Sequence, residues 1–167
     1  MKCSSCNSHK NMKAKSTIHK YIESGLDNIT LHGVIQHHCN DCGEIYYDYG
    51  DVNQLNNTIA GTLLRKKHNL NGKEIRFLRT YVGYSSEMFA RILGLDKTSL
   101  SRIENDRVKV SNQVNMTVRF VTGGKLTDRD YDLHDLFLAV EAEDYIEFKN
   151  AVFKMTNKGR WQLKQAG

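Results

Sequence analysis

The residues best able to do chemistry are four cysteines, which occur as two pairs. Each pair encloses two residues, and the pairs are Cys3 with Cys6 and Cys39 with Cys42. Two intervening residues let both thiolates of a pair turn towards one ion, and two such knuckles complete a tetrahedral shell of sulfurs. The sequence therefore predicts one structural Zn²⁺ per chain. A shell of four thiolates has no open coordination position, so we do not expect this metal to be catalytic.

Other interpretations of the cysteines stay open. A thioredoxin-like CxxC motif needs a βαβ context, which the sequence lacks, and two disulfides would need an oxidising compartment. His9, His37 or His38 could replace a thiolate, although surface histidines are the simpler interpretation. A hydrolytic or deaminase zinc site would need an open metal position and a nearby glutamate base. No glutamate accompanies His37, His38 and Cys39, so we do not expect an enzyme.

The cysteine pairs lie in a small β-rich segment. β-branched and aromatic residues come in near-alternation in three runs, which are TIHKYIES (17–24), NITLHGVIQHH (28–38) and EIYYDY (44–49). About fifty residues bury too little apolar surface to fold alone, so a staple is expected. Residues 1–50 are therefore predicted to form a zinc-binding domain.

After residue 50 the apolar spacing becomes helical. A helical linker is predicted over 51–70 and a helix-turn-helix domain over 71–124. Its expected helices are Lys73–Val82, Ser85–Leu93, Lys97–Glu104 and Ser111–Val121. Residues 125–167 form a carboxy-terminal extension, with an acidic amphipathic helix over Asp130–Val140. A hairpin around 156–159 is predicted for the tail, and a helix over Phe148–Met155 is the alternative. The fold class is accordingly α+β.

The segment 84–104 has the local chemistry of a DNA-recognition unit. Ser85 and Asp96 are placed to cap successive helices, and Gly94 permits a sharp turn between them. In the second helix the outward positions carry bases and short hydroxyls, namely Lys97, Thr98, Ser101 and Arg102. A helix entering the major groove uses such residues near its amino end. A small helical bundle with a polar surface is the alternative.

The distribution of charge also indicates that the middle of the chain binds nucleic acid. The 167-residue chain holds 24 Lys+Arg against 19 Asp+Glu, a net charge of +5, and residues 51–110 hold 11 bases against 6 acids. The segments on either side, 1–50 and 111–167, are each neutral. A basic module between neutral ones suggests a polyanion partner, with a solvated basic face as the alternative. The sequence lacks a long apolar run and an apolar leader, so we expect a cytoplasmic protein.

Residues 75–104, IRFLRTYVGYSSEMFARILGLDKTSLSRIE, resemble an Xre-type helix-turn-helix. With CSSC and CNDC at the amino terminus, residues 1–122 are similar to the MqsA/YgiT family of zinc-finger antitoxins. The resemblance implies zinc on the four cysteines and base contacts from Thr98 and Arg102. It also implies a homodimer on a palindromic operator, autorepression, and a zinc domain that faces a toxin.

The sequence departs from the family pattern at several points. Ser86 replaces a usual glutamine, which weakens an expected phosphate contact; Ser86 and Arg107 complete the candidate DNA contacts. Asp106 and Val110 replace a glycine and a proline, and 125–167 extends beyond the family's usual end. The expected function is a sequence-specific DNA-binding repressor of the antitoxin type. The alternatives are a regulator without a toxin, or a protein-interaction module built from the zinc domain and the extension.

Overall fold

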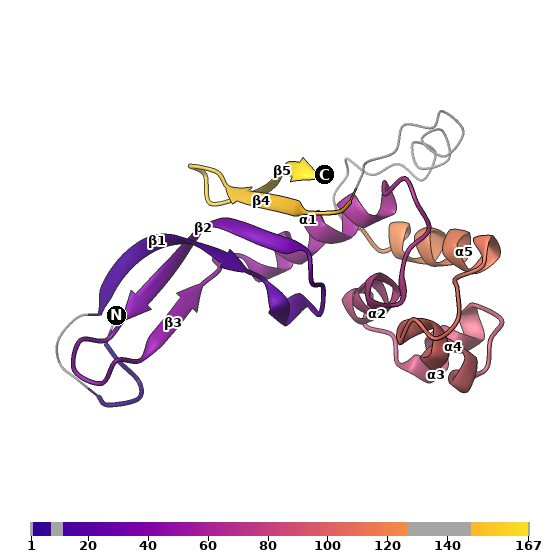
Figure 1. The fold of residues 1–167 in the computed structure, drawn as a ribbon, viewed down its shortest axis with the longest axis horizontal. Helices are drawn as coiled ribbons and strands as arrows, with labels where there is room; N and C mark the ends of the chain where they lie inside the picture. Colours follow the sequence, from indigo (N-terminus) through magenta and orange to yellow (C-terminus); the bar gives the residue numbers. More distant parts are fainter. Residues whose placement is uncertain (1, 8–11, 127–147, 167) are drawn as a thin grey trace.

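The computed structural model describes residues 2–7, 12–126 and 148–166 (Figure 1). In chain order its elements are β1 (Lys13–Lys20), the 3-10 turn η1 (Ile22–Ser24), β2 (Ile29–His38), β3 (Ile45–Asp48), α1 (Val52–Leu64), α2 (Gly72–Tyr81), α3 (Ser86–Ile92), α4 (Lys97–Glu104), α5 (Asn112–Gly123), β4 (Ala151–Met155) and β5 (Trp161–Ala166). The predicted α+β fold class is confirmed. No helix in these described ranges is long and apolar enough to span a membrane. The predicted helix Asp130–Val140 lies outside the described residues.

The strands form one five-stranded sheet in which β2 is central. β1 pairs with β2 along one edge, and β3 and β4 share the other edge, with β5 outside β4. A bulge at Gly33, whose φ is 95°, lets Leu31 and Val34 both be fully buried although they are three positions apart on β2. The first predicted strand, 17–24, is wrong in its second half. Residues 22–24 form η1 there, and Gly25 at φ 77° turns the chain back into β2.

The tail forms the predicted hairpin rather than a helix over Phe148–Met155. β4 and β5 are antiparallel, and the turn between them closes through Gly159 N–H to Thr156 O at 2.9 Å, with Gly159 at φ 72°. β4 then pairs in parallel with β2, Ile29 opposite Ala151 and Leu31 opposite Phe153. A segment that the sequence placed in an extension thus lies within the amino-terminal sheet.

The helices follow the predicted pattern, and each begins at a side-chain cap. The caps are Asp51, Asn71, Ser85, Asp96 and Ser111, and each accepts a backbone N–H from the first turn of its helix. Helix α1 packs against the sheet through β5 and also contacts α2 and α5. One continuous apolar cluster therefore runs from Leu31 and Phe153 in the sheet, through Ile59 in α1, to Leu78 and Leu100 in the helical part.

Candidate metal centre and nucleic-acid interface

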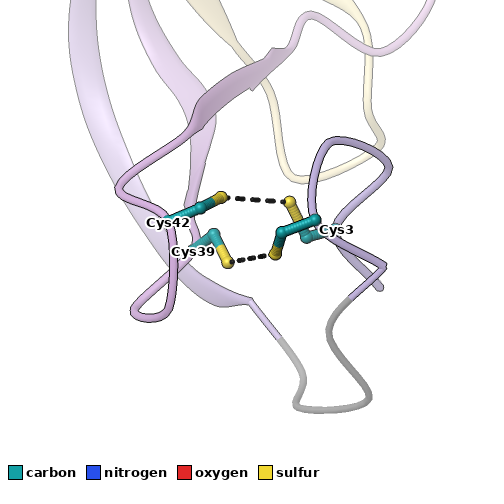
Figure 2. A group of neighbouring side chains, drawn as sticks. Cys3, Cys39 and Cys42 are labelled. Atoms are coloured by element: carbon teal, nitrogen blue, oxygen red, sulfur yellow. Dashed lines mark hydrogen bonds between the residues drawn. The ribbon is translucent and has the colours of Figure 1, made fainter.

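The four cysteines converge from two loops. Cys3 and Cys6 lie on the loop before β1, and Cys39 and Cys42 lie on the turn between β2 and β3 (Figure 2). That turn is tight because Gly43, at φ 76°, donates its N–H to Cys39 O at 3.0 Å. All four Sγ atoms lie within 4.8 Å of one another.

The spacing of the sulfurs fits a tetrahedral zinc ion. Cys3 Sγ lies 3.6 Å from Cys42 Sγ, and Cys6 Sγ lies 3.7 Å from Cys39 Sγ. With Zn–S bonds of about 2.3 Å, the sulfurs of a tetrahedral shell are about 3.8 Å apart. A disulfide would bring two sulfurs to about 2.05 Å, and all four thiols are free. The cluster can therefore hold a metal ion, and its four thiolates are the donor set that zinc prefers.

Crowding opposes the ionisation of neighbouring thiols. The backbone N–H of Cys6 lowers the pKa of the Cys3 thiol to about 6. For Cys42 the backbone N–H of Glu44 acts in the same direction, but the contact with Cys6, burial and the remaining thiols raise its pKa to about 12. A divalent cation would remove this conflict, because it stabilises every thiolate at once.

Histidines do not join the cluster in the described part of the chain, where the group of possible ligands consists of cysteines alone. His37 and His38 lie on β2 opposite Tyr46 and Ile45, and His9 lies outside the described residues. Buried Cys3 and Cys39 pack with Met12 and Tyr46. The hydroxyl of Tyr46 is 2.8 Å from Ser4 Oγ and 2.7 Å from Ser5 Oγ, so it ties the first knuckle to β3.

The second candidate site is the outer surface of α4. Leu100 and Ile103 are buried, whereas the four predicted contacts on α4 are exposed, namely Lys97, Thr98, Ser101 and Arg102. Arg107 is also exposed, just beyond α4, and Ser86 at the start of α3 is half-buried. The exposed face of α4 thus carries bases and hydroxyls, since its only carboxylate, Glu104, points inward and is 5% exposed.

Glu104 fixes the orientation of α4 and was missed at the sequence level. Arg79 Nε donates to Glu104 Oε1 at 2.6 Å, and Arg76 Nε lies 3.4 Å from Glu104 Oε2. Arg79 also donates to Tyr84 O at 3.1 Å, which links α2, α4 and the loop before α3. A glutamate at an inward position of an amphipathic helix is the signal that would have identified this anchor.

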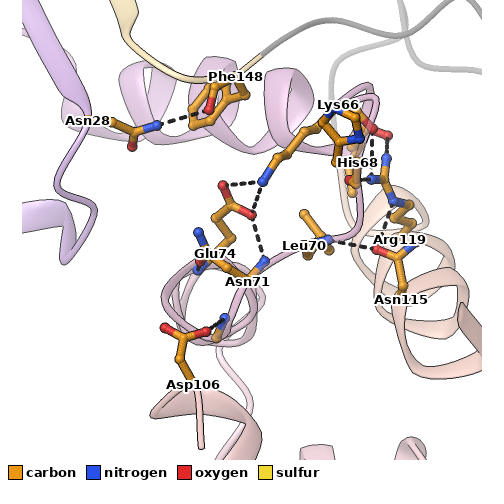
Figure 3. A network of polar contacts seen from close by, with 12 residues as sticks. Asn28, Lys66, His68, Leu70, Asn71, Glu74, Asp106, Asn115, Arg119 and Phe148 are labelled. Carbon is orange, nitrogen blue, oxygen red and sulfur yellow. Dashed lines mark hydrogen bonds and ion pairs between the residues drawn. The ribbon is translucent and has the colours of Figure 1, made fainter. Parts of the chain in front are cut away.

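Behind the helix-turn-helix, polar contacts fix the connection between α1 and α2 (Figure 3). Buried Arg119 donates to the carbonyl of Leu64, to Lys66 O at 2.9 Å and to His68 O at 3.0 Å. Those carbonyls lie at the end of α1 and just beyond it, where a cation is stabilised by the helix dipole. Lys66 Nζ in turn contacts Glu74 Oε2 of α2 at 2.8 Å. The sequence did not reveal the contacts of Arg119, because they join residues 51 to 55 positions apart in the chain.

Comparison with known proteins gives one match. Residues 1–133 match the model of a family described as the antitoxin component of bacterial toxin-antitoxin system, MqsA. No curated protein and no solved structure matches the chain. The matched range includes the cysteine cluster and all of α1–α5, and it ends before the β4–β5 hairpin.

Proposed function

This chain belongs to the MqsA antitoxin family, and we propose that it is a sequence-specific DNA-binding repressor that acts as a homodimer on a palindromic operator. Family membership makes it an antitoxin-type regulator. We further propose that it works by binding rather than by catalysis. The observation that carries the DNA-binding proposal is the exposed face of α4, where Lys97, Thr98, Ser101 and Arg102 stand without a carboxylate among them.

Each of these side chains suits a nucleic-acid contact. Arg102 can donate two hydrogen bonds to a guanine edge, and Thr98 or Ser101 can meet a base edge or a phosphate. We propose that Lys97 at the amino end of α4, Ser86 on α3 and Arg107 beyond α4 contact phosphates, which set the register of a protein on the duplex. The buried Arg79–Glu104 pair supports the proposal, because a recognition helix must be held at a fixed angle.

Arg102→Ala tests the assignment. We expect the variant to lose about 1–3 kcal/mol of discrimination between the operator and an altered operator, measured by gel shift with DNA from upstream of the gene. Lys67→Ala is the matched control, because Lys67 is an exposed base outside the helix-turn-helix. Unchanged sequence preference in Arg102→Ala would remove α4 from the recognition role.

We propose that Cys3, Cys6, Cys39 and Cys42 hold one structural Zn²⁺ per chain. Metal analysis of purified protein should find one zinc per chain, and Cys39→Ser should lower that ratio. A strong chelator should loosen the cysteine loops, because metal binding and local folding are coupled, while operator binding by α4 should persist. Loss of operator binding at the same chelator concentration would mean that the metal acts on the whole fold.

A toxin partner is the remaining part of the proposal, with a regulator that lacks a toxin as the second candidate. Co-expression with the neighbouring open reading frame, followed by co-purification and a growth assay, decides between them. The dimer is best tested on the full chain by sedimentation. Truncation before the hairpin would be ambiguous, because it removes Trp161 from the core shared by the sheet and α1.

A further inference from the structure

The segment after residue 147 carries charge of one sign only. Residues 148–167 contain five bases and no acid, and the five are Lys149, Lys154, Lys158, Arg160 and Lys164. All five side chains are exposed. Within the described ranges, no ion pair joins any of them to a carboxylate. No described carboxylate therefore neutralises these bases, and the eight acids of residues 127–147 lie outside the described residues. A positive cluster of this kind attracts polyanions.

The hairpin separates its apolar and cationic side chains onto two faces. Phe153 and Trp161 are buried against the rest of the protein, whereas Lys154 is exposed and lies opposite Gln162 in the β4–β5 register. A groove of about 700 Å³ lies along the hairpin. It is lined by four of the five cations, Lys154, Lys158, Arg160 and Lys164, by amide and hydroxyl side chains, and by the half-buried Met155 and Leu163.

This composition fits nucleic acid better than a protein partner. The centre of a protein–protein interface is enriched in aromatic residues and depleted in lysine, but the aromatic residues of this hairpin point inward. Interfaces with nucleic acid are more polar and far more positive. Amide side chains such as Gln162 and Asn157 can also donate to phosphates.

We propose that the β4–β5 hairpin is a second contact for a nucleic-acid phosphate backbone, used without sequence preference. The inference rests on the proposed function only in assuming that the protein binds nucleic acid. It goes beyond that function because the hairpin lies outside the family match, which ends at residue 133, and outside the helix-turn-helix.

The hairpin is held rigidly, as a preorganised binding surface requires. β4 is hydrogen-bonded to β2, and the backbone of Trp161 pairs with the side chain of Gln54 on α1. In Figure 1 the hairpin lies along the top of the molecule, whereas α3 and α4 lie at the lower right. The two surfaces therefore lie on different parts of the molecule, and substitutions in one leave the residues of the other unchanged.

The experiment compares full-length variants that lose four positive charges each. The hairpin variant carries Lys154→Gln, Lys158→Gln, Arg160→Gln and Lys164→Gln. The matched control removes four exposed lysines from other surfaces, by Lys2→Gln, Lys13→Gln, Lys15→Gln and Lys67→Gln. Both leave the buried anchors of the hairpin untouched, and circular dichroism checks their folding. Binding is measured across a salt series with a short duplex of arbitrary sequence and, separately, with single-stranded oligouridylate.

Counterion release fixes the size of the expected effect. Losing four phosphate contacts should flatten the log–log salt slope by about 3 to 4 on duplex DNA, or by about 3 on a single strand. The probe that shows this change identifies the kind of nucleic acid, and the control variant should keep the wild-type slope. Operator discrimination should survive in the hairpin variant, because α4 is unchanged.

Two results would overturn the inference, and they are distinguishable. If the hairpin variant keeps the wild-type slope on both probes while Arg102→Ala loses operator discrimination, the hairpin is not a nucleic-acid contact and the proposed function stands. An acidic protein segment then becomes the partner class to test. If the wild-type protein binds neither probe nor operator, both the inference and the proposed function fail.

Discussion

Gln54 and Trp161 lie 107 residues apart in the chain and hydrogen-bond each other in both directions. Trp161 N–H donates to Gln54 Oε1 at 2.7 Å, and Gln54 Nε2 donates to Trp161 O at 3.0 Å. The side chain of Gln54 thus pairs with the backbone of β5 much as another strand would. Trp161 is 1% exposed, and its indole N–H donates to Tyr49 O at 2.8 Å. The contact fastens the sheet to α1 and hence to the helical part of the protein.

Gln54→Ala should weaken this connection. It leaves the N–H of Trp161 without its partner and leaves the C=O with only a long contact from Thr58 Oγ1 at 3.5 Å. An unsatisfied buried polar group costs about 1–3 kcal/mol. Urea unfolding followed by intrinsic fluorescence is a direct measurement, because Trp161 is the only tryptophan. Gln113→Ala, an exposed glutamine on α5, is the control. Equal losses of unfolding free energy in the two variants would show that the Gln54–Trp161 pairing does not contribute to stability.

Glu104→Gln should destabilise the protein by about 3 kcal/mol, the lower end of the effect of breaking a buried ion pair. It leaves the guanidinium of Arg79, which is 15% exposed, without its carboxylate. Glu87→Gln is the matched control, because Glu87 is 72% exposed and pairs loosely with Arg91 at 3.9 Å. Chemical denaturation measures both. A similar small change in each variant would contradict a structural role for Glu104.

Gly72→Ala should also destabilise the contact between α2 and α4. A Cβ on Gly72 would meet the backbone carbonyl of Ile103 and lie 2.8 Å from the carbonyl carbon of Glu104. Neither backbone group can rotate away, so we expect a loss of about 1–3 kcal/mol, as for other overpacked sites. At Gly124 the nearest atom to a new Cβ is 3.6 Å away, so Gly124→Ala should be tolerated. Thermal melts of the two variants test the contrast.

The Asp96 cap of α4 should make the stability of the folded protein depend on pH. Hydrogen bonds from the Ser99 side chain and then from its backbone N–H lower the pKa of Asp96 below its ordinary value of 3.8. A carboxylate with a lowered folded pKa stabilises the protein above its unfolded pKa, and this contribution is lost as the pH falls through the folded value. Asp96→Asn keeps an uncharged cap. The wild type should therefore be more stable at neutral pH. The difference should begin to shrink as the pH falls below about 4 and should vanish only below the lowered folded pKa.

Denaturant unfolding of both proteins at several pH values measures that difference. A constant difference from neutral to acid pH would mean that the charge of Asp96 does not contribute to the cap. Operator binding of Asp96→Asn at neutral pH is a second measurement, since Lys97 and Thr98 lie in the turn that Asp96 caps.

The sequence alone determined the structural features of this protein that depend on residues close together in the chain. The CxxC spacings anticipated a cluster of sulfurs, and caps such as Asp96 with glycines such as Gly94 located α3 and α4 to within a residue or two. Hairpin chemistry around Gly159 likewise anticipated β4 and β5. Each of these signals acts over a few residues, so caps, turns and ligand pairs can be identified in the sequence without knowing the fold.

Only the tertiary structure decided what those parts are joined to. Three contacts link segments that are far apart in the chain. Glu104 is buried against Arg79, 25 residues away; Gln54 pairs with Trp161, 107 residues away; and β4 pairs in parallel with β2, next to the Asn28–Phe148 contact that spans 120 residues. Such pairings depend on which apolar faces meet when the whole core forms. The local sequence around an exposed lysine also does not indicate which other lysines will lie near it in the folded protein. The sequence thus located the bases of the tail, while the fold gathered four of them around one groove of the β4–β5 hairpin.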